Sequence, residues 1–154
     1  MRPEDFVRDL YPRAKPICQK NNISTVGCLA QCVQETGWGE HHPNNIWFGI
    51  KPWKRGQKRL QQKTVEELDG RPGLEETVDS FVAYSSFEDA VQGYCDFINH
   101  NRNYRKARQY PDDWRKYLPE VAKGGYATDP NYLALCILHA TAIEHLIYQL
   151  GLEA

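Results

Sequence analysis

The stretch at residues 34–39 (QETGWG) places one carboxylate, Glu35, beside two glycines and a tryptophan. Glu35 falls in the last turn of a predicted helix, where the negative end of the helix dipole disfavours a charged carboxylate. Trp38 lies three residues on and can exclude water, and both effects raise the pKa of a carboxyl group. A carboxylic acid that stays protonated near neutral pH can protonate a leaving-group oxygen, as in glycoside hydrolysis. An exposed glutamate at a helix end is the alternative that these residues leave open.

Tyr126 and the histidine pair at 41–42 each have two possible roles. Tyr126, in residues 124–130 (GGYATDP), can pack against the body of the protein or face a ligand. His41 and His42 can tune a nearby acid or bind sugar, but exposed loop histidines fit the same pattern. The residue types alone do not decide between these roles.

The bulk composition limits the classes of function. The 154 residues suit one domain with one core. The chain has 19 basic and 20 acidic residues, and the net charge of −1 gives no electrostatic footprint for nucleic acid. No apolar run is long enough to span a membrane, and the N-terminus has acids and prolines where a signal peptide needs an apolar stretch. We expect a monomer made in the cytoplasm that binds no nucleic acid and inserts in no membrane.

The five cysteines are an odd number, which argues against a secreted disulfide scaffold. We expect them to be reduced and mostly buried. A zinc site is the alternative, although no CxxC pair is present and the spacing fits no common zinc finger. Its ligands would come from Cys18, Cys28, Cys32, His41 and His42.

Helical periodicity dominates the N-terminal part of the chain. Apolar residues at helical spacing predict a helix over about 3–20, which Pro12 and Pro16 should kink or shorten. Ser24 can cap a second helix, and this helix should end just before Gly37, a residue that suits the position after a helix.

Helices resume in the C-terminal part. Ser85 and Glu88 form a capping box ahead of a helix with a continuous apolar face. A shorter helix is predicted near 112–122. The last helix should open with Asp129 as N-cap and Pro130 at its first position.

The middle of the chain, about 46–84, has a different pattern. Residues 46–50, 64–68 and 80–84 are each short and β-like, and the run over 51–59 is strongly basic. The prediction is therefore an α-rich α+β domain with a small β segment. A cleft between the helical body and this segment is the natural place for a ligand.

Four blocks taken together resemble glycoside hydrolase family 73, the peptidoglycan β-N-acetylglucosaminidases. Residues 34–39 are similar to that family's ESGWG signature, and residues 44–51 (NNIWFGIK) to its NNLFGIK block. Residues 81–90 (FVAYSSFEDA) resemble FRAYDSFEDSF, and residues 125–132 (GYATDPNY) resemble GYATDPNYA. The blocks occur in the family's order and cover nearly the whole chain. Thr36 replaces the family's serine, and Trp47 is an extra residue that would bulge a strand or face the cleft.

The resemblance implies a single catalytic domain over 1–154 with a lysozyme-like helical lobe, a small β-hairpin lobe over about 46–84 and the active-site cleft between them. It implies cleavage of the β-1,4 bond after N-acetylglucosamine in peptidoglycan, without a metal or cofactor. By motif match, Glu35 is the general acid and Tyr126 the functional tyrosine beside it. The substrate-binding residues that we predict are Trp38, Asn45, Phe48, Trp53 and Tyr132.

The second carboxylate is less well defined. In the family it often lies in a T-x-E stretch before a turn, which Glu66 fits best. Its rivals are Glu67, Glu75 and Glu76. The substrate's own acetamido group is an alternative nucleophile.

Other functions on the same scaffold stay open. A muramidase or lytic transglycosylase would cut the alternate bond, and a non-catalytic glycan-binding module would have lost the acid or the tyrosine. We expect a phage endolysin or its catalytic domain, acting on the bacterial cell wall after release or delivery. A delivered toxin or a piece of an autolysin are the alternatives.

Overall fold

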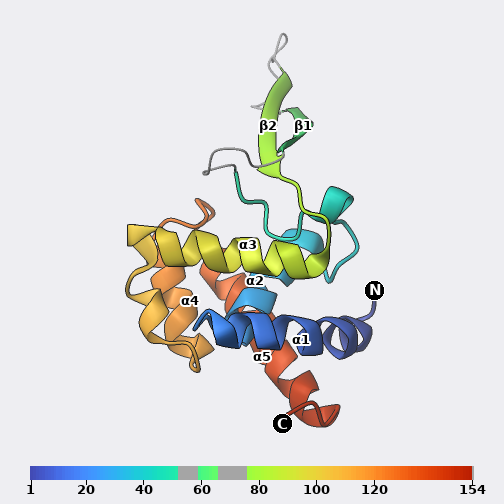
Figure 1. Cartoon of the computed structure of the whole chain (residues 1–154), viewed down its shortest axis with the longest axis vertical. Helices are drawn as coiled ribbons and strands as arrows, with labels where there is room; N and C mark the ends of the chain where they lie inside the picture. The colour runs from blue at the N-terminus through green and yellow to red at the C-terminus, as the bar shows by residue number, and fades with distance from the viewer. Residues whose placement is uncertain (52–58, 66–75, 154) are drawn as a thin grey trace.

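In the computed structural model the described residues are 1–51, 59–65 and 76–153, with the strands described by their backbone. They form a mainly helical protein, as predicted (Figure 1). Short 3₁₀ turns occupy Pro43–Asn45, Arg102–Tyr104 and Ala107–Gln109. The main elements are α1 (Pro3–Lys20), α2 (Thr25–Thr36), β1 (Arg59–Val65), β2 (Glu76–Val82), α3 (Phe87–His100), α4 (Trp114–Lys123) and α5 (Tyr132–Gln149).

The helix α1 spans the predicted residues and runs through Pro12 and Pro16, so of the two expected effects, a kink or a shortening, the shortening does not occur. Each proline removes one backbone donor from the helix. The buried face of α1, which includes Phe6 and Leu10, keeps the remaining turns packed on the protein. Packing of that face outweighs the lost hydrogen bonds.

The helix α2 begins and ends where the sequence predicts. The hydroxyl of Ser24 accepts a hydrogen bond from the backbone N–H of Gly27 at 3.0 Å, and Gly37 takes a left-handed conformation (φ 62°) at the other end. The helix packs against α1, α4 and α5, and Leu29 and Val33 are fully buried. Glu35 is thus carried by a helix at the centre of the protein.

Two of the predicted N-caps are wrong by one or two residues. Ser86, not Ser85, caps α3 by accepting from the N–H of Asp89 at 3.1 Å. The helix α5 starts after Asn131, while Asp129 accepts from the N–H of Asn131 at 2.8 Å in the turn before it. At α3 two adjacent serines can each serve as the cap, and sequence spacing does not rank them, whereas at α5 the side chain of Asn131 makes no capping hydrogen bond.

The segment at 46–50 is buried but is not a strand, so that prediction is wrong. Asn44, Asn45 and Gly49 all have left-handed backbone conformations, with φ between 53° and 60°. Such conformations interrupt an extended run, and asparagine and glycine are the residues that tolerate them. Trp47 does not face a cleft: the residue is 4% exposed, and its ring stacks on His42 with the ring centroids 3.9 Å apart.

The strands β1 and β2 pair antiparallel, in register from Arg59 opposite Val82 to Val65 opposite Glu76. They overlap the predicted strands at 64–68 and 80–84 only in part. Figure 1 shows them projecting from the helical body on the side of α3. The N–H of Val82 donates to the carbonyl of Ile50 at 2.9 Å, which joins the end of β2 to the buried segment at 46–50.

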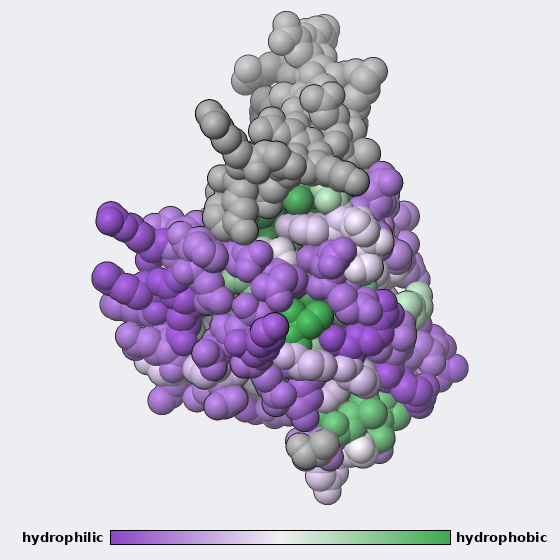
Figure 2. Space-filling model, in the orientation of Figure 1, coloured by the Kyte–Doolittle hydropathy of each residue, from purple (hydrophilic) through white to green (hydrophobic). Residues whose placement is uncertain are grey.

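The five cysteines are all free and buried, as predicted. Among the described residues, no group of three His, Cys, Asp or Glu side chains is arranged to hold a metal ion. The same part of the chain contains no helix with both the length and the apolar character needed to cross a membrane. Most of the surface on the face shown in Figure 2 is polar, and an apolar patch lies near its lower edge.

Candidate active site

Glu35, the penultimate residue of α2, has a side chain that solvent reaches. Burial by the surrounding protein nevertheless raises the pKa of its carboxyl above the ordinary value of 4.5. Exposure to solvent and a raised pKa occur together when a carboxyl group lies at the side of a cleft. Water then contacts one side of the group, and protein atoms replace water on the other sides. No described residue donates a hydrogen bond or forms an ion pair that would favour the charged form. The protonated acid is therefore favoured more than in a freely hydrated glutamate.

Gly49 lies directly against this carboxyl group. A Cβ atom at position 49 would be 2.5 Å from Oε1 of Glu35 and 2.8 Å from its Cδ. The backbone of Gly49 is also left-handed, with φ +60°. The left-handed backbone favours glycine at position 49, and the absence of a side chain there lets the Glu35 carboxyl lie against the segment at 46–50.

Tyr126 approaches the same segment from the loop before α5. Its hydroxyl donates to the backbone carbonyl of Phe48, one residue before Gly49, at 3.2 Å. Its ring stacks on Tyr132 at 5.9 Å. Burial raises the pKa of the Tyr126 hydroxyl, and the nearby Glu35 carboxylate adds to that shift. The structure therefore brings the two predicted catalytic residues Glu35 and Tyr126 into one neighbourhood.

A buried hydrogen-bond network beneath these residues was not predicted. Gln31 lies one helical turn before Glu35, is 1% exposed, and donates to the Tyr132 hydroxyl at 2.9 Å. Its carbonyl accepts from Tyr94, which also shares a hydrogen bond with Tyr117. The one available signal in the sequence was a glutamine on an otherwise apolar helical face, four residues before the acid. This network orients the tyrosine on which Tyr126 stacks.

Two more of the predicted substrate-binding residues, Trp38 and Asn45, have structural partners. Trp38 takes φ 59°, and its indole packs edge-on against Phe6 and His139. The Asn45 amide donates to the Tyr84 carbonyl at 3.1 Å.

Phe48 is 4% exposed and its ring stacks on Tyr94 with the ring centroids 4.6 Å apart, so its backbone oxygen rather than its ring contacts Tyr126. The substituted Thr36 also has a clear role. Its hydroxyl donates to the Cys32 carbonyl and accepts from the N–H of Gly39, both at 2.8 Å, which anchors the turn after Glu35.

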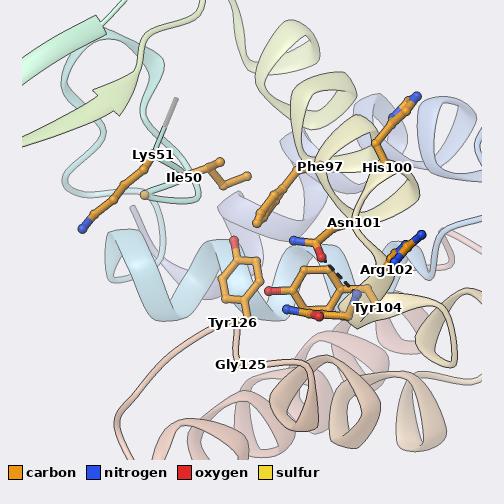
Figure 3. A pocket seen from close by; sticks show the side chains of 11 residues that line it. Ile50, Lys51, Phe97, His100, Asn101, Arg102, Tyr104, Gly125 and Tyr126 are labelled. Atoms are coloured by element: carbon orange, nitrogen blue, oxygen red, sulfur yellow. Dashed lines mark hydrogen bonds between the residues drawn. The ribbon is translucent and has the colours of Figure 1, made fainter. Parts of the chain in front are cut away.

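A cavity of about 660 Å³ opens beside this neighbourhood. Gly49 and Tyr126 line the cavity and also lie near Glu35, so the cavity adjoins the Glu35 carboxyl. Figure 3 shows it between the segment at 49–51, the end of α3 with the following turn, and the loop at 125–126. Its size suits a few sugar units or a branched ligand. The lining residues are Gly49, Ile50, Lys51, Phe97, His100, Asn101, Arg102, Asn103, Tyr104, Gly125 and Tyr126.

The remaining predicted site residues fall outside the part of the chain that is described. They are Glu66, the rival carboxylates Glu67 and Glu75, and Trp53. Glu76 opens β2, where the description covers the backbone alone.

A family model and a solved structure both match this chain over most of its length. The glucosaminidase family model, described as mannosyl-glycoprotein endo-beta-N-acetylglucosaminidase, matches residues 11–151. The crystal structure of a peptidoglycan hydrolase mutant from Sphingomonas sp. A1 superposes with a TM-score of 0.77 at 28% identity, covering 95% of this chain and 99% of that one.

Two curated relatives show similar identity. The peptidoglycan hydrolase FlgJ of Vibrio parahaemolyticus is 32% identical over 137 residues, which are 84% of this chain and 44% of FlgJ. A probable N-acetylmuramidase of Lactococcus lactis is 30% identical over 139 residues, 84% of this chain and 31% of that protein. The chain thus spans less than half the length of these relatives.

Proposed function

This chain belongs to the glucosaminidase family of glycoside hydrolases, and from that membership we propose that it hydrolyses the β-1,4 glycosidic bond after N-acetylglucosamine in peptidoglycan. The observation that carries the proposal is the Glu35 carboxyl, reachable by solvent, pressed against Gly49 and raised in pKa by burial. A two-carboxyl or substrate-assisted glycosidase needs such an acid, and neither mechanism requires a metal or cofactor.

In the proposed reaction Glu35 gives its proton to the oxygen of the departing sugar as the bond from that oxygen to the anomeric carbon breaks. The positive charge that develops at the anomeric carbon is stabilised by a second carboxylate, for which Glu66 is our proposal, or by the acetamido group of the substrate. Water then completes the hydrolysis. Tyr126 orients the acid or the acetamido group. Two contacts support this role: the Tyr126 hydroxyl donates to the carbonyl of Phe48, and the next residue, Gly49, lies against the Glu35 carboxyl.

We propose that the glycan strand lies in a cleft between the helical lobe and a β-hairpin lobe, in one catalytic domain that acts as a monomer. The antiparallel pairing of β1 and β2 beside the segment at 46–50 supports this arrangement. The contacts that we propose for the glycan come from Trp38, Asn45, Phe48, Trp53 and Tyr132. The place of action is the bacterial cell wall, as the names of the relatives suggest for those proteins. Origin as a phage endolysin stays a prediction.

Tyr126→Phe is expected to lower kcat on peptidoglycan roughly 10- to 100-fold, because it removes a positioned hydroxyl and leaves the Phe48 carbonyl without that donor. The ring stack on Tyr132 survives the substitution, so Tm should change little. Tyr148→Phe, at a side chain that is 75% exposed on α5, is the matched control and should behave as the wild type. Equal kcat values for Tyr126→Phe and the wild type would remove Tyr126 from the mechanism.

A muramidase is the second candidate, because one relative of 30% identity is named a probable N-acetylmuramidase. Mass spectrometry of fragments released from purified peptidoglycan, after borohydride reduction, separates the two. We expect reduced N-acetylglucosamine at the new ends. Reduced muramic acid would indicate a muramidase and anhydromuramic acid a transglycosylase. No fragments from several wall types would favour a non-catalytic glycan-binding module.

A further inference from the structure

The cavity beside Tyr126 combines an aromatic floor with a cationic rim. Phe97, Tyr104 and Tyr126 pack on one another with ring centroids 5.6 to 6.2 Å apart. Lys51 and Arg102 line the cavity and lie on opposite sides of Tyr126 in Figure 3. No described residue that lines the cavity carries a carboxylate. The charge at this rim therefore contrasts with the net charge of −1 of the whole chain.

The turn after α3 concentrates hydrogen-bond donors at the rim. The side-chain oxygen of Asn101 accepts from the N–H of Asn103 at 3.0 Å, which leaves the amide NH₂ of Asn101 as a donor. Arg102 is exposed and forms no ion pair with any described residue. Between Asp96 and Asp112 the sequence holds no acid, while Arg105, Lys106 and Arg108 follow Arg102. An anionic or acceptor-rich ligand fits this rim, because a neutral sugar would leave the guanidinium of Arg102 without a counter-charge.

We propose that this rim binds a free carboxylate of the stem peptide attached to the glycan strand that is being cut. The inference rests on the proposed function, because the cavity shares Gly49 and Tyr126 with the neighbourhood of Glu35. A muramic acid unit in a neighbouring subsite carries its peptide on a side branch, and that peptide ends in carboxylates. The guanidinium of Arg102 pairs with one carboxylate through two parallel N–H···O bonds. Specificity for peptide-bearing glycan follows from this contact.

The first test compares Arg102→Gln with Arg105→Gln on two substrates, intact peptidoglycan and glycan strands that an amidase has freed of peptide and that are then methyl-esterified at the lactyl carboxyl groups that the amidase exposes. Arg105 is exposed in the same turn but does not line the cavity, so it is the matched control. The ratio of kcat/KM on intact wall to that on peptide-free glycan should fall about tenfold in Arg102→Gln, chiefly through KM, which is the size expected for a charge-assisted hydrogen bond. It should keep the wild-type value in Arg105→Gln. An unchanged ratio in Arg102→Gln would overturn the inference.

The second test measures binding without turnover. The Glu35→Gln protein is titrated with a soluble N-acetylglucosaminyl-N-acetylmuramyl pentapeptide and with the same compound after amidation of its carboxyl groups. Amidation should weaken binding about tenfold, and adding Arg102→Gln should abolish that difference. Equal affinities for the two compounds, or displacement by a teichoic acid with no effect of amidation, would refute the peptide contact. If the wild type cut neither substrate, the proposed function would fail while this binding result still decided the inference.

Discussion

Glu35→Gln is expected to lower kcat on peptidoglycan by about 10²- to 10⁴-fold, the usual contribution of a positioned general acid. Glutamine keeps the size and shape of the side chain beside Gly49 but has no proton to give. The fold should be retained, since no described residue donates to or forms an ion pair with the carboxyl group. The release of soluble fragments and the far-UV circular dichroism of the variant measure the two effects. Lytic activity equal to that of the wild type would exclude Glu35 as the acid.

The pH dependence of stability and of kcat/KM provides a control for the role of Glu35. Its folded pKa is raised, so ionisation costs stability as pH rises from the ordinary value of 4.5 through the folded value. Glu35→Gln should therefore be at least as stable as the wild type near neutral pH, and lose this advantage below the ordinary pKa. In the wild type kcat/KM should fall as pH rises past the folded pKa, because the acid must be protonated. If the residual activity of Glu35→Gln fell with rising pH in the same way, the fall would belong to another titrating group.

Gly49→Ala is expected to lower kcat by about 10²-fold or more, because a misplacement of roughly 1 Å at a reacting group has effects of this size. The new Cβ would be 2.5 Å from Oε1 and 3.1 Å from Oε2 of Glu35, so the carboxyl must move. The left-handed backbone at φ +60° adds roughly 1–2 kcal/mol of strain for alanine. Steady-state kinetics and thermal unfolding of the same preparation separate the two contributions.

Gly151→Ala is the matched control for backbone strain. Gly151 has φ +65°, and no heavy atom lies within 4 Å of the position that a Cβ atom would take there. This variant should lose stability to a similar extent and keep its kcat. In a Glu35→Gln background, Gly49→Ala should have little further effect on kcat, because the group that it displaces is already inactive. An independent loss in the double variant would mean that Gly49 acts on something other than Glu35.

The sequence by itself determined the local parts of this site. Ser24 and Gly37 bound α2 through contacts within a few residues, so the position of Glu35 at the helix end follows from capping chemistry alone. The four family blocks added the expected roles of Glu35 and Tyr126, and these roles stay predictions. The apolar faces of α1 and α3 were likewise readable, because helical periodicity is a property of neighbouring turns.

Only the tertiary structure decided how these parts meet. The segment at 46–50 was predicted as a strand from its apolar residues, but its left-handed positions turn it into a buried support for Glu35. The link from Tyr126 to the carbonyl of Phe48 joins residues 78 positions apart, and the bond from Gln31 to Tyr132 spans 101. Such contacts depend on how helices pack around a shared core, and no spacing in the sequence encodes them. The helix end that carries Glu35 was therefore predictable from local residues, whereas the contacts that surround Glu35 were not.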